Sequence, residues 1–317
     1  MQGRYWTVII GLMVFIAGAC ADRNKKGELM DTPTYGVIKI AVDESLKPLI
    51  EAEIDTFEGL YKDAHIQAQY MSETNAIDAL LKDSVRMIVT TRKLAKEEED
   101  AIVASKIFPT QLKIAKDGIA IILNKSNPDT LIQLNQLKSI LDGTITNWKQ
   151  INPSAKSLPL QVVFDSPNSG MIRFLSDSVT PISIDKIPAT FYALNSNKAV
   201  VDFVSQNANA IGLIGVSWIS NKHDSTATSF LRSVRIAGLQ KDTGEYYQPY
   251  QAYLAMGQYA LQRDVHMISR EARSGLATGF MAFVASDRGQ RIVLKSGLVP
   301  STMPLRIVEI KHGQLSE

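Results

Sequence analysis

The chain has 317 residues, of which 45% are hydrophobic and 21% are charged. Its 34 lysines and arginines nearly balance its 32 aspartates and glutamates, so the formal net charge at pH 7 is +2. So small a charge gives no strong electrostatic attraction to nucleic acid, and the single cysteine has no second thiol in the chain for a disulfide.

An apolar run at residues 8–20 opens the chain and ends at that cysteine, Cys20. The run is too short to span a bilayer as a stable helix, but it has the length of a secretory signal. Small residues directly before Cys20 resemble a lipobox, although Ala17 stands where leucine is usual. Residues 1–20 are therefore predicted to be a lipoprotein signal peptide, with Cys20 as the lipidation site. The alternative is an ordinary signal peptide or a short anchor with an incidental cysteine.

Residues 21–34 are polar and turn-rich, which is typical of a tether between a lipid and a folded domain. About 280 residues remain, enough for two domains of ordinary size. When the Cys20 thiol carries a lipid, the mature chain has no thiol left to act as a nucleophile or to bind a metal. Short strand-like runs alternate in it with amphipathic helical stretches, and this alternation predicts an α/β fold.

The first three predicted strands lie at residues 37–42, 66–70 and 87–89, and small polar residues follow each of them. In an open parallel sheet such strand ends line up along one edge, where ligands bind. Hydroxyls, backbone N–H groups and one guanidinium there predict a site for a compact anion. The candidate ligand-binding residues in these loops are Ser45, Ser72, Thr90, Thr91 and Arg92.

The next stretch has a strand, the motif Asn-x-x-Asn-Pro at residues 124–128, a helix, and the motif Gly-x-Ile-Thr-Asn-Trp ending at Trp148. This order of elements resembles the substrate-binding proteins of phosphate ABC transporters. Trp148 by itself is more typical of a packing anchor than of a ligand contact. Four later segments agree with the same family, at residues 162–175, 209–215, 259–263 and 283–300. The resemblance covers nearly all of the predicted mature chain.

The resemblance implies the two-lobed clamshell of type II periplasmic binding proteins, an α/β fold in which each lobe is a mixed sheet flanked by helices. Lobe one is expected to comprise residues 35–115 plus 265–317, and lobe two residues 116–264, with the ligand in the cleft between them. The implied function is an extracytoplasmic lipoprotein that captures inorganic phosphate and delivers it to an ABC permease and ATPase complex. Such a protein is expected to be a monomer, periplasmic or at the cell surface, held to the membrane by its N-terminal lipid.

In lobe two, Ser169 and Gly170 form a turn that opens a predicted helix, and a helix N-terminus offers free N–H groups to an oxyanion. Gly170 lets the backbone approach closely, and Ser169 adds a hydroxyl. A serine there is equally consistent with a plain N-cap. Met171 stands where the family usually has threonine. The resemblance makes these three residues the predicted ligand contacts of lobe two.

Two charges differ from the family pattern. Arg92 lies in the third loop, where the family often has an acidic residue, and Asp165 lies ahead of Ser169, where the family has an arginine. We expect Arg92 to supply the cation for the anion, and Asp165 either to orient Arg92 across the cleft or to accept the ligand's proton. An acceptor such as Asp165 or Glu73 beside the anion would favour phosphate over sulfate, which has no proton to donate. The alternative for Arg92 is a solvated residue at the start of the next helix.

The residues do not indicate an enzyme. The four histidines lack the paired spacing of a metal site, and Ser169 does not lie in a Gly-x-Ser-x-Gly elbow. The carboxylates at residues 97–100 are expected to form a solvated helix face. We therefore expect no catalytic residues, no metal and no cofactor. Two alternatives remain open: an oxyanion sensor or adhesion module with the same fold, and the binding of another tetrahedral oxyanion.

Overall fold

The computed structural model describes residues 31–155, 157–182, 190–220, 225–241 and 244–303. The predicted signal peptide, Cys20 and most of the predicted tether lie outside the described residues. The end of the tether contacts the folded body, because the Asp31 carboxylate accepts hydrogen bonds from Arg86 and Arg273. Among the described residues, none of the helices has both the length and the apolar character that crossing a membrane requires.

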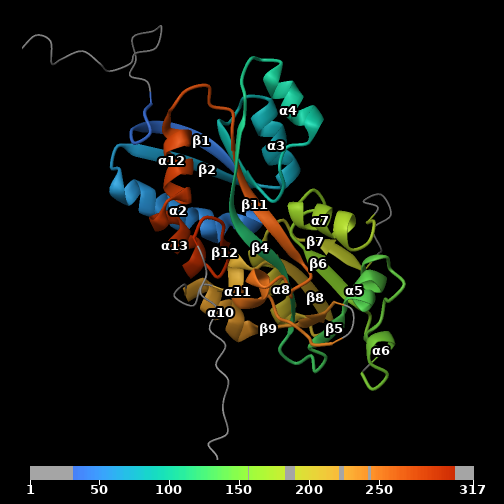
Figure 1. The fold of residues 1–317 in the computed structure, drawn as a ribbon. Coiled ribbons are helices and arrows are strands. Elements are labelled where there is room, and N and C mark those ends of the chain that lie inside the picture. Colours follow the sequence, from blue (N-terminus) through green and yellow to red (C-terminus); the bar gives the residue numbers. More distant parts are fainter. Residues whose placement is uncertain (1–30, 156, 183–189, 221–224, 242–243, 304–317) are drawn as a thin grey trace, which may run out of the picture.

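Lobe one is the half of the molecule built from the first three strands and from the chain near its end (Figure 1). Its strands are β1 (Gly36–Asp43), β2 (Ala64–Met71), β3 (Met87–Thr90), the first part of β4 (Thr110–Asn124), β11 (Gln262–Ser269) and β12 (Val299–Pro300). Its helices are the 3-10 turn η1 (Glu44–Leu46), α2 (Lys47–Leu60), α3 (Glu73–Leu81), α4 (Lys96–Val103), α12 (Leu276–Ala285) and α13 (Asp287–Lys295). The three strands predicted from the sequence are thus confirmed.

Lobe two is the other half, built from the segment between β4 and β11 (Figure 1). Its strands are the second part of β4, β5 (Leu131–Gln133), β6 (Gln161–Phe164), β7 (Phe191–Ala193), β8 (Ala210–Gly215), β9 (Val234–Ile236) and β10 (Gly238–Gln240). Its helices are α5 (Leu134–Leu141), α6 (Trp148–Ile151), α7 (Gly170–Ser178), α8 (Asn197–Gln206), α9 (Ser217–Ser220), α10 (Ser225–Ser233) and α11 (Gln251–Ala255).

A single mixed sheet runs through both lobes, in the order β2-β1-β3-β11-β4-β8-β6-β7. In lobe one, β1 pairs in parallel with β2 and β3. In lobe two, β6 pairs in parallel with β7 and β8. The long strand β4 connects the two halves, because it pairs antiparallel with β11 through Gly118 and with β8 from Ile119. The structure therefore confirms an α/β fold with a mixed sheet in each lobe.

Each lobe has its own hydrophobic core. The core of lobe two contains buried side chains between Ile119 and Leu261. In lobe one, alternate residues of β1 face opposite sides of the sheet: Ile40 packs with α2 and α12, whereas Ala41 packs with α3. The predicted lobe boundaries stay a prediction, which the separation of these cores supports.

Helix α2 carries an ionisable side chain in this core. Glu53 is 0% exposed, and neither of its carboxylate oxygens has a hydrogen-bond partner among the described residues. Burial raises the pKa of Glu53 from 4.5 to about 9, because an ionised carboxylate loses its hydration there. Glu53 is therefore protonated in the folded protein at neutral pH.

Glu53→Gln is expected to reduce the dependence of stability on pH. The folded wild type holds a proton that the unfolded chain releases above about pH 4.5, so its stability falls as the pH rises toward 9. From about pH 5 to about pH 8, the wild type should lose about 4 kcal/mol more unfolding free energy than the variant. Urea unfolding of both proteins at the two pH values measures this difference, and parallel losses would contradict it.

Candidate functional site

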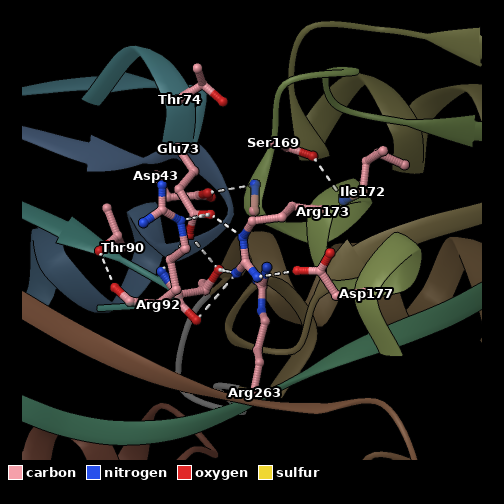
Figure 2. Close-up of polar contacts among 12 residues, drawn as sticks. Asp43, Glu73, Thr74, Thr90, Arg92, Ser169, Ile172, Arg173, Asp177 and Arg263 are labelled. Atoms are coloured by element: carbon pink, nitrogen blue, oxygen red, sulfur yellow. Dashed lines mark hydrogen bonds and ion pairs between the residues drawn. The ribbon is translucent and has the colours of Figure 1, made fainter. Parts of the chain in front are cut away.

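The strand ends of lobe one meet the first turn of α7 in lobe two (Figure 2). Because β1, β2 and β3 run parallel, their carboxyl ends lie along one edge of the sheet. Asp43 ends β1, Glu73 begins the helix after β2, and Thr91 follows β3. Ser169 lies opposite them, at the turn between β6 and α7, and its neighbour Gly170 contacts Asp43. The fold thus brings together polar groups that lie far apart in the sequence.

The first turn of α7 contacts lobe one directly. Ser169 is the N-cap, and its Oγ accepts a hydrogen bond of 3.4 Å from the backbone N–H of Ile172. The backbone N–H of Gly170 donates a hydrogen bond of 3.2 Å to Asp43 Oδ2 in the opposite lobe. Free N–H groups and the helix dipole favour negative charge at this end of a helix, so Asp43 occupies a position suited to an anion.

Gly170 has no room for a side chain. A Cβ there would lie 2.6 Å from Glu73 Oε2 and 2.9 Å from Asp43 Oδ2, and closer still to Thr91 Oγ1. All three atoms belong to lobe one. Glycine is required at this position because the two lobes approach each other too closely for any larger residue.

Glu73 connects the lobes through its carboxylate and is only 2% exposed. Its Oε2 accepts hydrogen bonds from the backbone N–H and the hydroxyl of Thr91, at 2.7 and 2.6 Å. Its Oε1 accepts one of 2.5 Å from Arg173 Nε, on α7. Burial by itself would raise the pKa of Glu73, but the Arg173 charge and these hydrogen bonds outweigh it and lower the pKa. Glu73 is therefore an ionised carboxylate held by donors of both lobes.

A second buried network surrounds Arg263, on the returning strand β11. Its Nε and Nη2 donate to Asp117 Oδ2 at 3.0 and 2.9 Å, and Nη2 also donates to Ser45 Oγ at 2.7 Å. Ser45 in turn donates its hydroxyl and its backbone N–H to Asp43 Oδ1. Burial raises the pKa of Asp43, and the positive charge of Arg263 opposes that rise.

Asp165 is the fourth carboxylate of this region and is 2% exposed. Burial, and then the charge of Asp43, raise the pKa of Asp165 to about 7. Its Oδ1 has no hydrogen-bond partner among the described residues. Despite these carboxylates, no group of His, Cys, Asp or Glu within the described ranges is arranged to hold a metal ion.

Three of the predicted ligand contacts do not take part in the two hydrogen-bond networks described above. The hydroxyl of Thr90 donates to the backbone carbonyl of Arg92 at 2.9 Å. Ser72 is the N-cap of α3, but its buried Oγ makes no capping bond and has no partner among the described residues. The Met171 side chain is fully buried in the core of lobe two, so only its backbone is left to face the cleft. Their roles toward a ligand stay predictions.

Arg92 is bound by carboxylates of its own lobe. Its Nη1 and Nη2 donate to the two oxygens of Glu98, both at 2.7 Å, and its Nε lies 3.8 Å from Glu73 Oε1. Glu98 belongs to the carboxylate run that was predicted to be a solvated helix face, and this prediction is wrong for that residue. Among the described residues, Arg92 makes no hydrogen bond or ion pair with Asp165, so the orientation of one by the other stays a prediction.

A cavity of about 250 Å³ opens beside this contact between the lobes. Arg92 and Thr74 line it from lobe one, and Ser169 and Arg173 line it from lobe two. Thr74 also donates its backbone N–H and its hydroxyl to the Asn168 carbonyl, at 3.3 and 3.2 Å. The guanidinium of the third loop and Ser169 of the serine-glycine turn therefore line one hollow.

Four charged residues of the site are not among those predicted from the sequence: Asp43, Asp117, Arg173 and Arg263. Asp43 ends a predicted strand directly before the candidate Ser45, so its position was a usable signal. Asp117 and Arg263 give a weaker signal, because each stands next to another charged residue, Lys116 and Asp264 respectively. Arg173 gives no local signal, because a charged residue in an amphipathic helix is usually solvated.

Comparison with known protein families identifies the fold. A family model described as "PBP superfamily domain" matches residues 30–288. A protein named phosphate-binding protein PstS from Staphylococcus epidermidis is 25% identical over 289 residues, which cover 90% of this chain and 84% of the relative. A protein of the same name from Staphylococcus aureus is 23% identical, with the same coverage.

Solved structures agree with this assignment. A structure from Clostridium perfringens, described as a phosphate ABC transporter substrate-binding protein with bound phosphate, has a TM-score of 0.71 and 24% identity. An ABC-type phosphate transport receptor from Vibrio cholerae has a TM-score of 0.63 and 22% identity. Each covers 84% of this chain and is itself matched over its full length. The predicted type II periplasmic-binding fold is thereby confirmed.

Gly170→Ala is expected to lower the free energy of unfolding by about 1–3 kcal/mol, because the added Cβ overlaps oxygens of the opposite lobe. Gly59→Ala, in exposed space near the end of α2, is the matched control and should raise it by about 0.5 kcal/mol. Urea unfolding of the two variants and the wild type measures both changes. Equal stability of Gly170→Ala and the wild type would contradict a direct contact between the lobes.

Proposed function

The chain belongs to the PBP superfamily, and on this premise we propose that it is a receptor that binds inorganic phosphate between its lobes for an ABC transporter. Delivery would be to a permease and ATPase complex. The observation that carries the proposal is the serine-glycine turn of α7, whose N-terminus faces the strand ends of lobe one (Figure 2). Relatives named for phosphate binding support the choice of ligand.

Phosphate loses its water when two lobes close on it, so the protein must supply fixed hydrogen-bond donors in exchange. Lobe two offers the Gly170 N–H and the Arg173 guanidinium. Lobe one offers the hydroxyls of Ser45 and Thr91, both of which already donate to carboxylates. Arg263 adds a buried positive charge next to Ser45. What these donors share is their place around two carboxylates, because Gly170 and Ser45 donate to Asp43, and Arg173 and Thr91 donate to Glu73.

The charges of the site impose a condition on binding. The carboxylates Asp43, Glu73, Asp117 and Asp165 outnumber the guanidiniums Arg173 and Arg263 of the same contacts. A phosphate dianion is repelled by such a site unless some carboxyl groups are protonated. Asp165, with a pKa of about 7, is the group that takes up a proton most readily near neutral pH. A carboxylate beside the anion also accepts a proton from phosphate, which sulfate cannot offer.

We further propose that the receptor is an extracytoplasmic monomer held at the membrane by a lipid on Cys20. This rests on the apolar run before Cys20 and on the polar segment after it. No catalytic step is proposed, because the relatives are named for phosphate binding and transport and not for a reaction.

A second candidate function is an oxyanion sensor or an adhesion module with the same fold. The observation in its favour is that carboxylates of the chain itself already engage the donors of the site, through Asp43 and Glu73. A binding experiment separates the adhesion module, which has no need to bind phosphate, whereas a sensor is separated from a transport receptor by the membrane partner that co-purifies with it.

Titration calorimetry of the full-length protein with phosphate, sulfate and molybdate tests the proposed function. Saturable heat is expected with phosphate and not with sulfate. Ser169→Ala should weaken phosphate binding by about tenfold to a hundredfold, because it removes a cap from the anion-binding turn. Ser286→Ala, which removes an equivalent cap from α13, should leave the affinity unchanged. Absence of heat with every oxyanion would remove the proposal.

Phosphate affinity is also expected to depend on the protonation of Asp165. Above its pKa of about 7 the residue is ionised and repels the anion, so affinity falls as the pH rises. Between about pH 6 and about pH 8, the wild type should lose about tenfold more affinity than Asp165→Asn. The variant corrects for the titration of phosphate itself, which is the same in both experiments. Identical pH profiles would show that Asp165 does not face the ligand.

A further inference from the structure

The two lobes are joined by direct hydrogen bonds between groups of the chain. Besides the contacts of Glu73 and Asp43, the Glu44 carboxylate accepts from the backbone N–H and the side-chain amide of Asn197, at 3.0 and 2.5 Å. The hydroxyl of Ser217 donates to the Ser45 carbonyl at 3.1 Å. Arg173 Nη2 donates to the hydroxyl oxygen and the carbonyl of Thr91, at 3.2 and 3.4 Å. The lobes are therefore closed upon each other by their own residues.

Two of these contacts use the donors that an oxyanion would need. The Gly170 N–H donates to Asp43, and the Arg173 Nε donates to Glu73. Both acceptors are carboxylates of lobe one, and both are almost completely buried. A carboxylate resembles one edge of a phosphate ion in charge and in its two acceptor oxygens. The position of the anion is thus taken by an acidic pair that belongs to the opposite lobe.

We propose that Glu73 and Asp43 are built-in counter-ligands, which hold the lobes together and determine the affinity of the site for its oxyanion. The competition with the anion rests on the proposed function, whereas the closure of the lobes does not. Phosphate enters by exchange: it takes the Arg173 guanidinium and the α7 N-terminus from the two carboxylates. The binding free energy is then the difference between two sets of similar contacts, so the receptor binds more weakly than its donors alone would allow.

Glu73 is the better of the two residues for a test, because its partner Arg173 also binds a second carboxylate, Asp177, which supplies a matched control. Arg173 Nη1 donates to Asp177 at 3.1 Å, within α7 and without bridging the lobes. Glu73→Gln and Asp177→Asn remove the same charge from the same guanidinium. Only the first weakens a contact between the lobes. Any difference between the two variants is therefore due to the loss of the contact between the lobes and not to the changed net charge of the site.

Hydrogen–deuterium exchange of the full-length protein measures closure. The Gly170 amide lies in the first turn of α7, where amides have no partner within the helix, so its protection reports the contact with lobe one. In phosphate-free buffer, peptides around residue 170 should exchange about tenfold faster in Glu73→Gln than in the wild type or Asp177→Asn. Phosphate should slow them in Glu73→Gln and leave the wild type nearly unchanged. Fast exchange in the unliganded wild type, slowed by phosphate, would overturn the proposal.

Arg173→Ala removes the same bridge from the other lobe and serves as a second variant. It should accelerate exchange at Thr74, whose backbone N–H donates across the cleft to the Asn168 carbonyl. Unchanged protection at Thr74 would also count against the bridge. The exchange rates in phosphate-free buffer do not depend on phosphate binding, so they remain decisive even if the proposed function fails.

Phosphate titration of the same variants tests the competition. Glu73→Gln should bind phosphate about tenfold more tightly than Asp177→Asn. Equal or weaker binding would overturn the role of Glu73 as a counter-ligand and assign it to the binding site itself.

Discussion

The contact between the first turn of α7 and the carboxylates of lobe one determines how the two lobes sit against each other. Each lobe has its own core, so either half would keep its packing if the other moved. Besides the shared strand β4, their relation is fixed by a small set of hydrogen bonds across the cleft, several of which go to carboxylates. Gly170 makes these bonds possible by leaving the space that a side chain would fill. The helix N-terminus then does for Asp43 what it is proposed to do for a phosphate ion.

The charges of this contact decide under which conditions the site can take up an anion. The positive groups at the cleft are Arg173 and Arg263, and each already has a carboxylate partner. Arg92, the cation expected from the sequence, is held by Glu98 instead. A site in which every cation is neutralised binds an anion only by exchange or with uptake of protons. Both routes place the control of affinity in acidic residues and not in the arginines.

The sequence predicted the fold well, because strands and helices follow from local periodicity and the order of motifs covers nearly the whole chain. It also predicted the Ser169–Gly170 turn, because the residue types of the turn are themselves a local signal. It missed the pairing of Arg263 with Asp117, since nothing near either residue identifies a partner 146 positions away. Met171 shows a different limit: its place in the motif suggested the cleft, whereas its side chain packs in the core of lobe two, so a role of its backbone toward the ligand stays a prediction.

A crystal structure of the protein grown with phosphate would test the central claim most directly. The account predicts an anion between the lobes that accepts a hydrogen bond from the Gly170 backbone, with the Glu73 carboxylate displaced from Arg173. Phosphate bound elsewhere, or a cleft in which Glu73 still holds Arg173 at saturating phosphate, would contradict it.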